Sequence, residues 1–163
     1  MTINRREFLA LSSVSLVGSS LSAQTSTALL ALSGDFGVLR NQGLDDAALS
    51  AMPQISFETK TPWTIGKSTF SGPALSTLLT MFNAGPGDLR LTAANAYSVV
   101  VSRSIVTLDA PIIATRMNGR AFNRRENGPL WIMFPFDSST KFHQENVYAA
   151  SVWQLETITV LKS

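Results

Sequence analysis

Apolar and polar residues alternate along several short stretches of this chain, and that pattern predicts strands more often than helices. Residues 55–59 alternate with a period of two, as a half-buried strand does, and residues 63–65 predict another short strand. The continuous apolar run 130–135 is typical of a strand that is buried on both faces. Further strands are expected over residues 34–39, 89–93, 97–101, 112–117 and 151–161, after a lead-in over 24–33.

Two segments predict helices. Asp45 and Asp46 favour the first turn of a helix over residues 43–52, which Pro53 ends. Gly72-Pro73 predicts the start of a second helix, in which apolar residues follow at helical spacing until the turn cluster at residues 83–88. Asn118-Gly119 and residues 127–129 predict tight turns between strands. The pattern therefore predicts a single α+β domain with mostly antiparallel, mixed sheets and a few helices.

The first 23 residues have the composition of a secretory signal peptide. Arg5 and Arg6 give a positive start, residues 8–21 are moderately apolar, and Ser22-Ala23 suit cleavage before residue 24. The segment around the two arginines resembles the twin-arginine export motif, and an ordinary Sec signal is the alternative. We expect a signal peptide over 1–23, a domain over 24–163, and a periplasmic protein that is not itself embedded in a membrane.

Composition and charge exclude several kinds of site. Thirteen Lys and Arg against eleven Asp and Glu give a net charge of +2, and the basic residues are scattered, so no nucleic-acid partner is expected. The chain has no Cys, which excludes disulfides, iron–sulfur clusters, thiolate zinc sites and cysteine nucleophiles. Its single His, His143, cannot form a multi-histidine metal site and is expected at the surface.

The order of short motifs in the second half resembles a known family. These motifs are Asn95-Ala96-Tyr97-Ser98-Val99, Ile113-Ala114 before Asn118-Gly119, Asn127-Gly128-Pro129-Leu130-Trp131, and Val152-Trp153-Gln154-Leu155. Together with the helix start at Gly72-Pro73, they resemble the molybdopterin-binding domain of sulfite-oxidase-like enzymes over about residues 55–160. The resemblance implies the α+β fold of that domain.

One departure from the family pattern changes what the resemblance implies. The family's molybdenum-ligating Cys is expected upstream of the helix, and residues 58–70 contain no Cys. This combination resembles small periplasmic proteins of the same superfamily that bind reduced pterins. Those proteins regulate a membrane-bound cyclic-di-GMP synthase or phosphodiesterase through its periplasmic domain. The resemblance therefore implies a metal-free pterin-binding protein that signals to such a partner and is not an enzyme.

Two alternatives remain open from the sequence. One is a small periplasmic molybdopterin-dependent oxidoreductase that uses an oxygen ligand or no protein ligand to the metal. The other is an exported accessory protein that binds only another protein.

A pterin site needs an aromatic or apolar wall and hydrogen-bonding groups for the edge of the heterocycle. Trp63 is the candidate to stack on the ring. The other candidates lie on loops that match the family's pocket: Asn95, Tyr97, Arg116, Asn118, Arg120, Asn127, Gly128 and Pro129.

Each candidate also has a structural interpretation. Asn118 is consistent with a plain hairpin turn, Tyr97 with a half-buried core aromatic, and Arg116 and Arg120 with solvent-facing side chains. Trp131 and Trp153 are assigned to the core, and residues 124–126 to a solvated charge cluster or a partner-docking edge.

Overall fold

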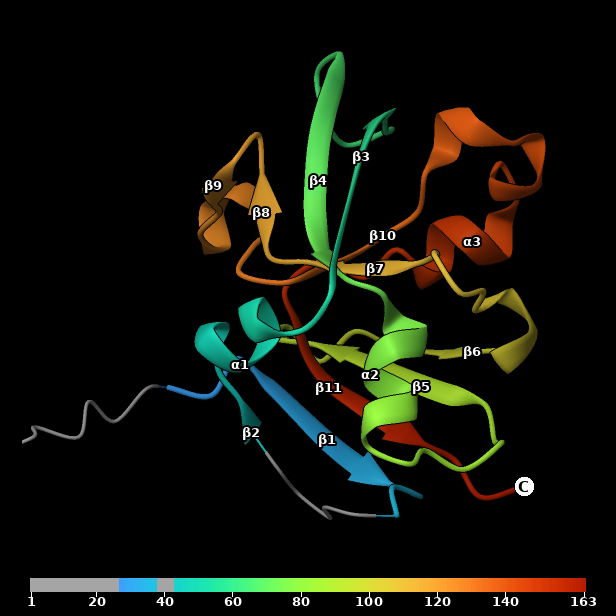
Figure 1. The fold of residues 1–163 in the computed structure, drawn as a ribbon. Helices are drawn as coiled ribbons and strands as arrows, with labels where there is room; N and C mark the ends of the chain where they lie inside the picture. Colours follow the sequence, from blue (N-terminus) through green and yellow to red (C-terminus); the bar gives the residue numbers. More distant parts are fainter. Residues whose placement is uncertain (1–26, 38–42) are drawn as a thin grey trace, which may run out of the picture.

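The computed structural model describes residues 27–37 and 43–163, so the predicted signal peptide lies outside the described chain. Its largest sheet has five strands in the order β2-β1-β11-β5-β6 (Figure 1). The pairing of β1 with β11 is parallel and the other pairings are antiparallel. The bounds are Leu30–Gly34 for β1, Gly43–Leu44 for β2, Leu89–Ala93 for β5, Ser98–Val101 for β6 and Leu155–Val160 for β11.

Two smaller sheets complete the strands. A four-stranded sheet runs in the order β3-β4-β8-β9, with bounds Gln54–Lys60, Lys67–Pro73, Arg116–Met117 and Arg120–Ala121. The long hairpin of β3 and β4 rises from the rest of the domain (Figure 1). The third sheet pairs β7 (Ile112–Ala114) with β10 (Trp131–Met133), and all six of these residues are buried. This confirms the predicted α+β domain of antiparallel and mixed sheets.

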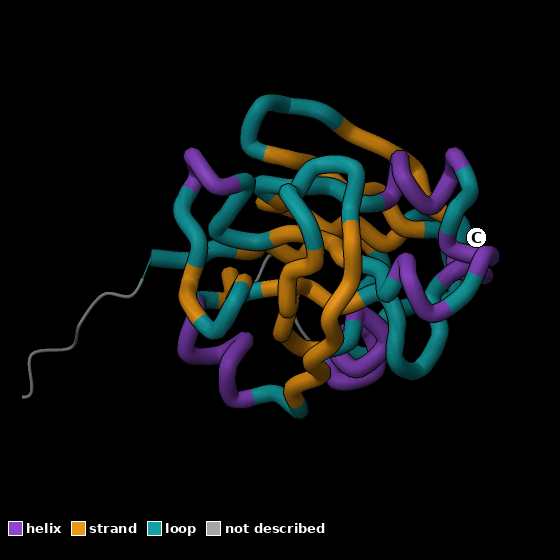
Figure 2. Tube along the Cα trace, turned by 90° about the horizontal axis from the view of Figure 1, so that it is seen from above, coloured by secondary structure: helices purple, strands orange, loops and turns teal. Residues whose placement is uncertain are grey.

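The helices are short and lie around the outside of the strands (Figure 2). The α-helices are α1 (Asp46–Ala51), α2 (Leu75–Met81) and α3 (Glu145–Ala150). The 3-10 turns are η1 (Arg103–Ile105), η2 (Arg124–Glu126), η3 (Phe136–Ser138) and η4 (Thr140–Phe142). No helix of the described residues is long and apolar enough to cross a membrane.

Local chemistry explains where the two predicted helices begin. The Asp45 side chain caps α1 by accepting a hydrogen bond from the Ala48 backbone N–H at 2.7 Å. The first two residues of the predicted helix, 43 and 44, instead pair as β2 with β1. Helix α2 buries Leu75, Leu78 and Leu79, as the helical spacing predicts.

The prediction of a strand over residues 63–65 is wrong. These residues lie in the loop that joins β3 to β4, where Thr61 Oγ1 accepts the Trp63 backbone N–H at 3.1 Å. Gly66 has a φ of +69°, a conformation that glycine adopts without strain. The chain therefore reverses where the β-favouring residues predicted an extended segment.

The ends of the domain also differ from the prediction. The expected lead-in over 24–33 contains most of β1, whose Leu30 and Leu32 are buried. The strand expected over 34–39 does not form across its described part, because the chain leaves the sheet at Gly34 with a φ of +86°. The expected final strand over 151–161 is shorter, and β11 begins only at Leu155. Helix α3 and strand β4 were not predicted.

Candidate functional site

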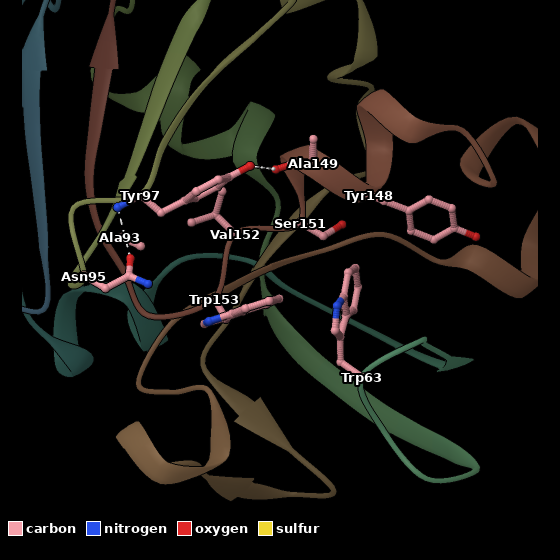
Figure 3. Close-up of a pocket in the computed structure, with 9 residues that line it drawn as sticks. All are labelled: Trp63, Ala93, Asn95, Tyr97, Tyr148, Ala149, Ser151, Val152 and Trp153. Atoms are coloured by element: carbon pink, nitrogen blue, oxygen red, sulfur yellow. Dashed lines mark hydrogen bonds between the residues drawn. The ribbon is translucent and has the colours of Figure 1, made fainter.

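A cavity of about 260 Å³ opens beside the base of the β3–β4 loop (Figure 3). Three separate parts of the chain form it: the β3–β4 loop, the turn between β5 and β6, and the segment from α3 towards β11. Its lining residues are Trp63, Ala93, Asn95, Tyr97, Tyr148, Ala149, Ser151, Val152 and Trp153. We call this space the aromatic cavity.

Aromatic rings form much of the wall. Trp63 and Trp153 meet edge to face, with ring centroids 5.8 Å apart and planes at 67°. Tyr148 contacts Trp63 at 6.1 Å, also edge to face. In Figure 3 the Trp153 ring extends towards Trp63, although the two residues come from distant parts of the chain. These edge-to-face contacts join the three rings into one continuous wall of the cavity.

The polar groups of the cavity are neutral. Asn95 Oδ1 accepts the Tyr97 backbone N–H at 3.0 Å, so the Asn95 amide NH₂ group remains as a donor. The Tyr97 hydroxyl donates to the Ala149 carbonyl at 3.4 Å, a long bond that an incoming ligand can replace at small cost. Ser151 Oγ already donates to the Val147 carbonyl at 2.9 Å. No charged side chain is among the described residues that line this cavity.

Hydrogen bonds of the β3–β4 loop position Trp63. Besides accepting the Trp63 N–H, the Thr61 hydroxyl lies 2.9 Å from the Thr64 hydroxyl across the loop. The buried Thr59 Oγ1 accepts the Asp137 backbone N–H at 3.1 Å, which ties β3 to η3. Phe136 of η3 then packs on Trp63 at 6.1 Å. The loop is therefore held at both its start and its middle.

Three of the nine candidate residues come together in the aromatic cavity, namely Trp63, Asn95 and Tyr97. Arg116 does not line it. Its guanidinium donates two hydrogen bonds, of 2.7 and 2.8 Å, to the Asp46 carboxylate at the start of α1. This hydrogen bonding lowers the pKa of Asp46 from its ordinary value and raises the pKa of Arg116.

Asn118 and Arg120 lie at the β8–β9 hairpin, away from the lining of the aromatic cavity. Asn118 has a φ of +53° and its Oδ1 accepts the Thr69 backbone N–H at 2.9 Å. It therefore forms the hairpin turn and also ties that turn to β4.

The remaining candidates, Asn127, Gly128 and Pro129, form the turn after η2. Asn127 has a φ of +67°, and its carbonyl accepts the Gln154 N–H at 3.1 Å. A Cβ atom at Gly128 would overlap the Phe122 carbonyl, so only glycine fits there. Pro129 borders a different hollow, beside β1 and β11.

The other lining residues were not predicted from the sequence. Trp153 was assigned to the core, but its side chain is 36% exposed and forms a wall of the cavity. Tyr148, Ala149 and Ser151 were missed together with α3. The only sequence signal for that helix is the spacing of Val147 and Ala150, its two buried residues, which is too short to show a period.

Comparisons with known proteins support the fold. No protein-family model and no curated protein matches this chain. Among solved structures, the chain is similar to the sulfane dehydrogenase SoxCD from Paracoccus pantotrophus, with a TM-score of 0.60 and 16% sequence identity. The match covers 82% of this chain and 38% of that chain, so this chain spans well under half of that protein. The domain therefore has the sulfite-oxidase-like fold that the motif order predicted.

The residues present do not fit the molybdenum cofactor of that fold family. The sequence contains no Cys, so this chain has no thiolate to ligate the metal. Among the described residues, no group of three or more His, Cys, Asp or Glu is placed to hold a metal ion. None of the described residues that line the aromatic cavity has a basic side chain to pair with the phosphate of molybdopterin.

Proposed function

We propose that this protein binds a flat, unphosphorylated pterin in the aromatic cavity, without a metal and without catalysing a reaction. One observation carries the proposal: the cavity has aromatic walls from Trp63, Tyr97, Tyr148 and Trp153, and no described residue of its lining is charged. Small-molecule sites are mostly apolar clefts in which a few polar groups fix the orientation of the ligand.

The polar groups suit the edge of a pterin. The Asn95 NH₂ group can donate to a ring carbonyl or ring nitrogen, and the Ala149 carbonyl can accept from a ring N–H or amino group. Stacking on the indole of Trp63 or Trp153 would supply most of the contact area.

The absence of charge in the lining favours a neutral ligand. A phosphate group would lose its hydration on entering the cavity, and no guanidinium or ammonium lines the cavity to compensate. An unphosphorylated pterin carries no such penalty. This argument, and the missing Cys, make the oxidoreductase alternative the less favoured one.

The proposal also includes export and signalling. Residues 1–23 would direct the chain to the periplasm, where ligand occupancy would be passed to the periplasmic domain of a membrane-bound cyclic-di-GMP enzyme. The signal-peptide pattern around Arg5 and Arg6 and the family resemblance support this part.

The test is an anaerobic titration of the purified chain with 7,8-dihydroneopterin and with oxidised neopterin, by calorimetry and tryptophan fluorescence. We expect one site for at least one of the two redox forms. Trp153→Ala should weaken binding by about tenfold, because an aromatic contact contributes up to about 1.5 kcal/mol beyond the area that it buries.

Ile65→Ala is the matched control, because Ile65 lies on the same loop as Trp63 but its side chain is fully exposed. It should leave the affinity within twofold of the wild type. Binding of neither pterin would overturn the proposal. Equal affinity of the wild type and Trp153→Ala would place the ligand outside the aromatic cavity.

A further inference from the structure

Another hollow, of about 270 Å³, is lined by residues of the β8–β9 hairpin and of η2. Its polar lining comes from Asn118, Arg120, Asn123 and Glu126, and the buried ring of Phe122 also lines it. We call it the donor hollow. None of these residues lines the aromatic cavity.

The side-chain amides of Asn118 and Asn123 both accept hydrogen bonds from backbone N–H groups through their oxygen atoms. Asn118 Oδ1 accepts from the Thr69 N–H, and Asn123 Oδ1 accepts from the Arg125 N–H, each at 2.9 Å. An amide whose oxygen is used in this way offers only its NH₂ group to another molecule. The two side chains therefore act as hydrogen-bond donors.

Arg120 adds an unpaired positive charge. Its side chain is exposed and makes no hydrogen bond or ion pair within the part of the chain that the structure describes. Arg125 is likewise exposed and unpaired there, whereas Arg116 and Arg124 are paired with Asp46 and Glu156. Residues 116–126 hold four Arg and one Glu, so this short segment is more basic than the rest of the chain, whose basic residues are scattered.

We propose that the donor hollow docks a carboxylate side chain from an acidic surface of another protein. Arg120 would receive it through the two parallel N–H groups of its guanidinium, which match a carboxylate in geometry. The amides of Asn118 and Asn123 would donate to the same group. The Glu126 carboxylate accepts the Asn123 N–H at 3.3 Å, so one of its oxygen atoms is already used within the hairpin region.

A protein fits this surface better than an anionic membrane does. Lipid-binding segments carry clusters of about 4–8 basic residues. Here two of the four arginines are already paired within the chain, and a glutamate lies at the hollow. The surface therefore suits a few carboxylates in fixed positions on a protein better than the continuous negative charge of an anionic membrane.

The donor hollow is in packing contact with the aromatic cavity. Phe122 lines the hollow and contacts the buried Trp131 at 6.4 Å between ring centroids. Trp131 in turn contacts Trp63 at 5.8 Å and Trp153 at 6.2 Å. Identifying the acidic protein with the membrane partner rests on the proposed function, but the docking surface itself does not depend on it.

The test uses the ligand-free purified chain and a fluorescein-labelled hexaglutamate peptide, with hexaglutamine as the neutral probe. Fluorescence polarisation at about 20 mM salt limits the screening of exposed charges. We expect saturable binding of hexaglutamate and none of hexaglutamine. Because no pterin is present, failure here would leave the pterin proposal untouched.

Two pairs of variants separate the donor hollow from general surface charge. Asn118→Asp keeps the oxygen that accepts the Thr69 N–H, loses the NH₂ donor and adds a negative charge, so the peptide should bind at least tenfold more weakly. Asn146→Asp makes the same change elsewhere, because Asn146 is exposed and its Oδ1 accepts the Val147 N–H at 3.0 Å.

Arg120→Gln should also weaken binding at least tenfold, whereas Arg90→Gln on the exposed side of β5 is its control.

Both controls should stay within threefold of the wild type. If each control variant weakens binding as much as its partner variant, the peptide responds only to the net charge of the protein, and the proposal fails. It also fails if hexaglutamate does not bind, or if Asn118→Asp and Arg120→Gln bind it normally. Recruitment by phosphatidylglycerol vesicles without peptide binding would overturn it in favour of a membrane surface.

Discussion

Arg116 donates two hydrogen bonds to Asp46, and this pairing assigns it a structural role in the described chain. Asp46→Asn should lower the free energy of unfolding at pH 7 by about 0.5–1 kcal/mol, because the carboxylate is half-exposed and the pair is partly screened. Chemical denaturation of both proteins measures the difference.

The pH dependence of that difference follows from the direction of the pKa shift. The pKa of Asp46 is lowered in the folded protein, so its contribution is complete above the pKa of the unfolded chain. The contribution is lost as the pH falls through the folded pKa. Wild type and Asp46→Asn should therefore converge at acid pH, whereas Asp109→Asn, an exposed control, should have nearly the stability of the wild type at pH 7.

Single tryptophans show what a sequence can and cannot reveal about a site. Trp63, between Pro62 and Thr64, was a candidate because it precedes the open groove of the family that the chain resembles. Trp153 was assigned to the core, because alternation with a period of two marks a sheet face without saying what covers it. In the fold, Trp153 precedes β11, and residues of α3 and of the β3–β4 loop line the cavity beside it.

At the scale of elements, the β3–β4 loop determines where Trp63 lies. Thr61→Val should weaken pterin binding by about threefold to tenfold and cost about 1 kcal/mol of stability, because the Trp63 N–H loses its hydrogen-bond acceptor. Valine matches the shape of threonine at this buried position. Titration and hydrogen exchange over residues 61–66 measure both effects.

Thr69→Val on the neighbouring strand is the matched control, since the Thr69 side chain is exposed and its hydroxyl makes no hydrogen bond in the described chain. It should leave both affinity and exchange unchanged. If Thr61→Val behaves like Thr69→Val, the hydrogen bond does not position Trp63.

Elements with a clear period were predicted, and short elements were not. Strand β3 matches the alternation at residues 55–59, β5 matches the strand expected over residues 89–93, and β10 lies within the apolar run 130–135. Helix α3 has six residues, fewer than two full turns, so its buried face is marked by only two side chains. Strand β1 forms by pairing with β11, which is distant in the sequence. The local pattern of apolar and polar residues does not predict such a long-range pairing.

At the scale of the whole molecule, the motifs that identified the fold mostly serve the backbone. Asn118 and Asn127 have positive φ values, and Gly128 packs against a carbonyl where a Cβ has no space. These residues are required by the backbone conformation of the fold, and the requirement does not depend on which ligand is bound. The order of the motifs therefore predicted the sulfite-oxidase-like fold. It identified only some of the residues that line the aromatic cavity.

Ligand binding should be visible in the stability of the whole domain. At a pterin concentration of 100 times Kd, binding to the folded chain alone adds about 2.7 kcal/mol, which raises Tm by roughly 6–12 °C for a domain of this size. If Trp153→Ala weakens binding tenfold, the same concentration adds about 1.4 kcal/mol, and about half of the shift remains. Differential scanning calorimetry with and without 7,8-dihydroneopterin measures this, and 7,8-dihydroneopterin triphosphate should give a much smaller shift, because the cavity has no basic lining residue for its phosphates. An equal shift with the phosphorylated compound would contradict the neutral cavity as the site of binding.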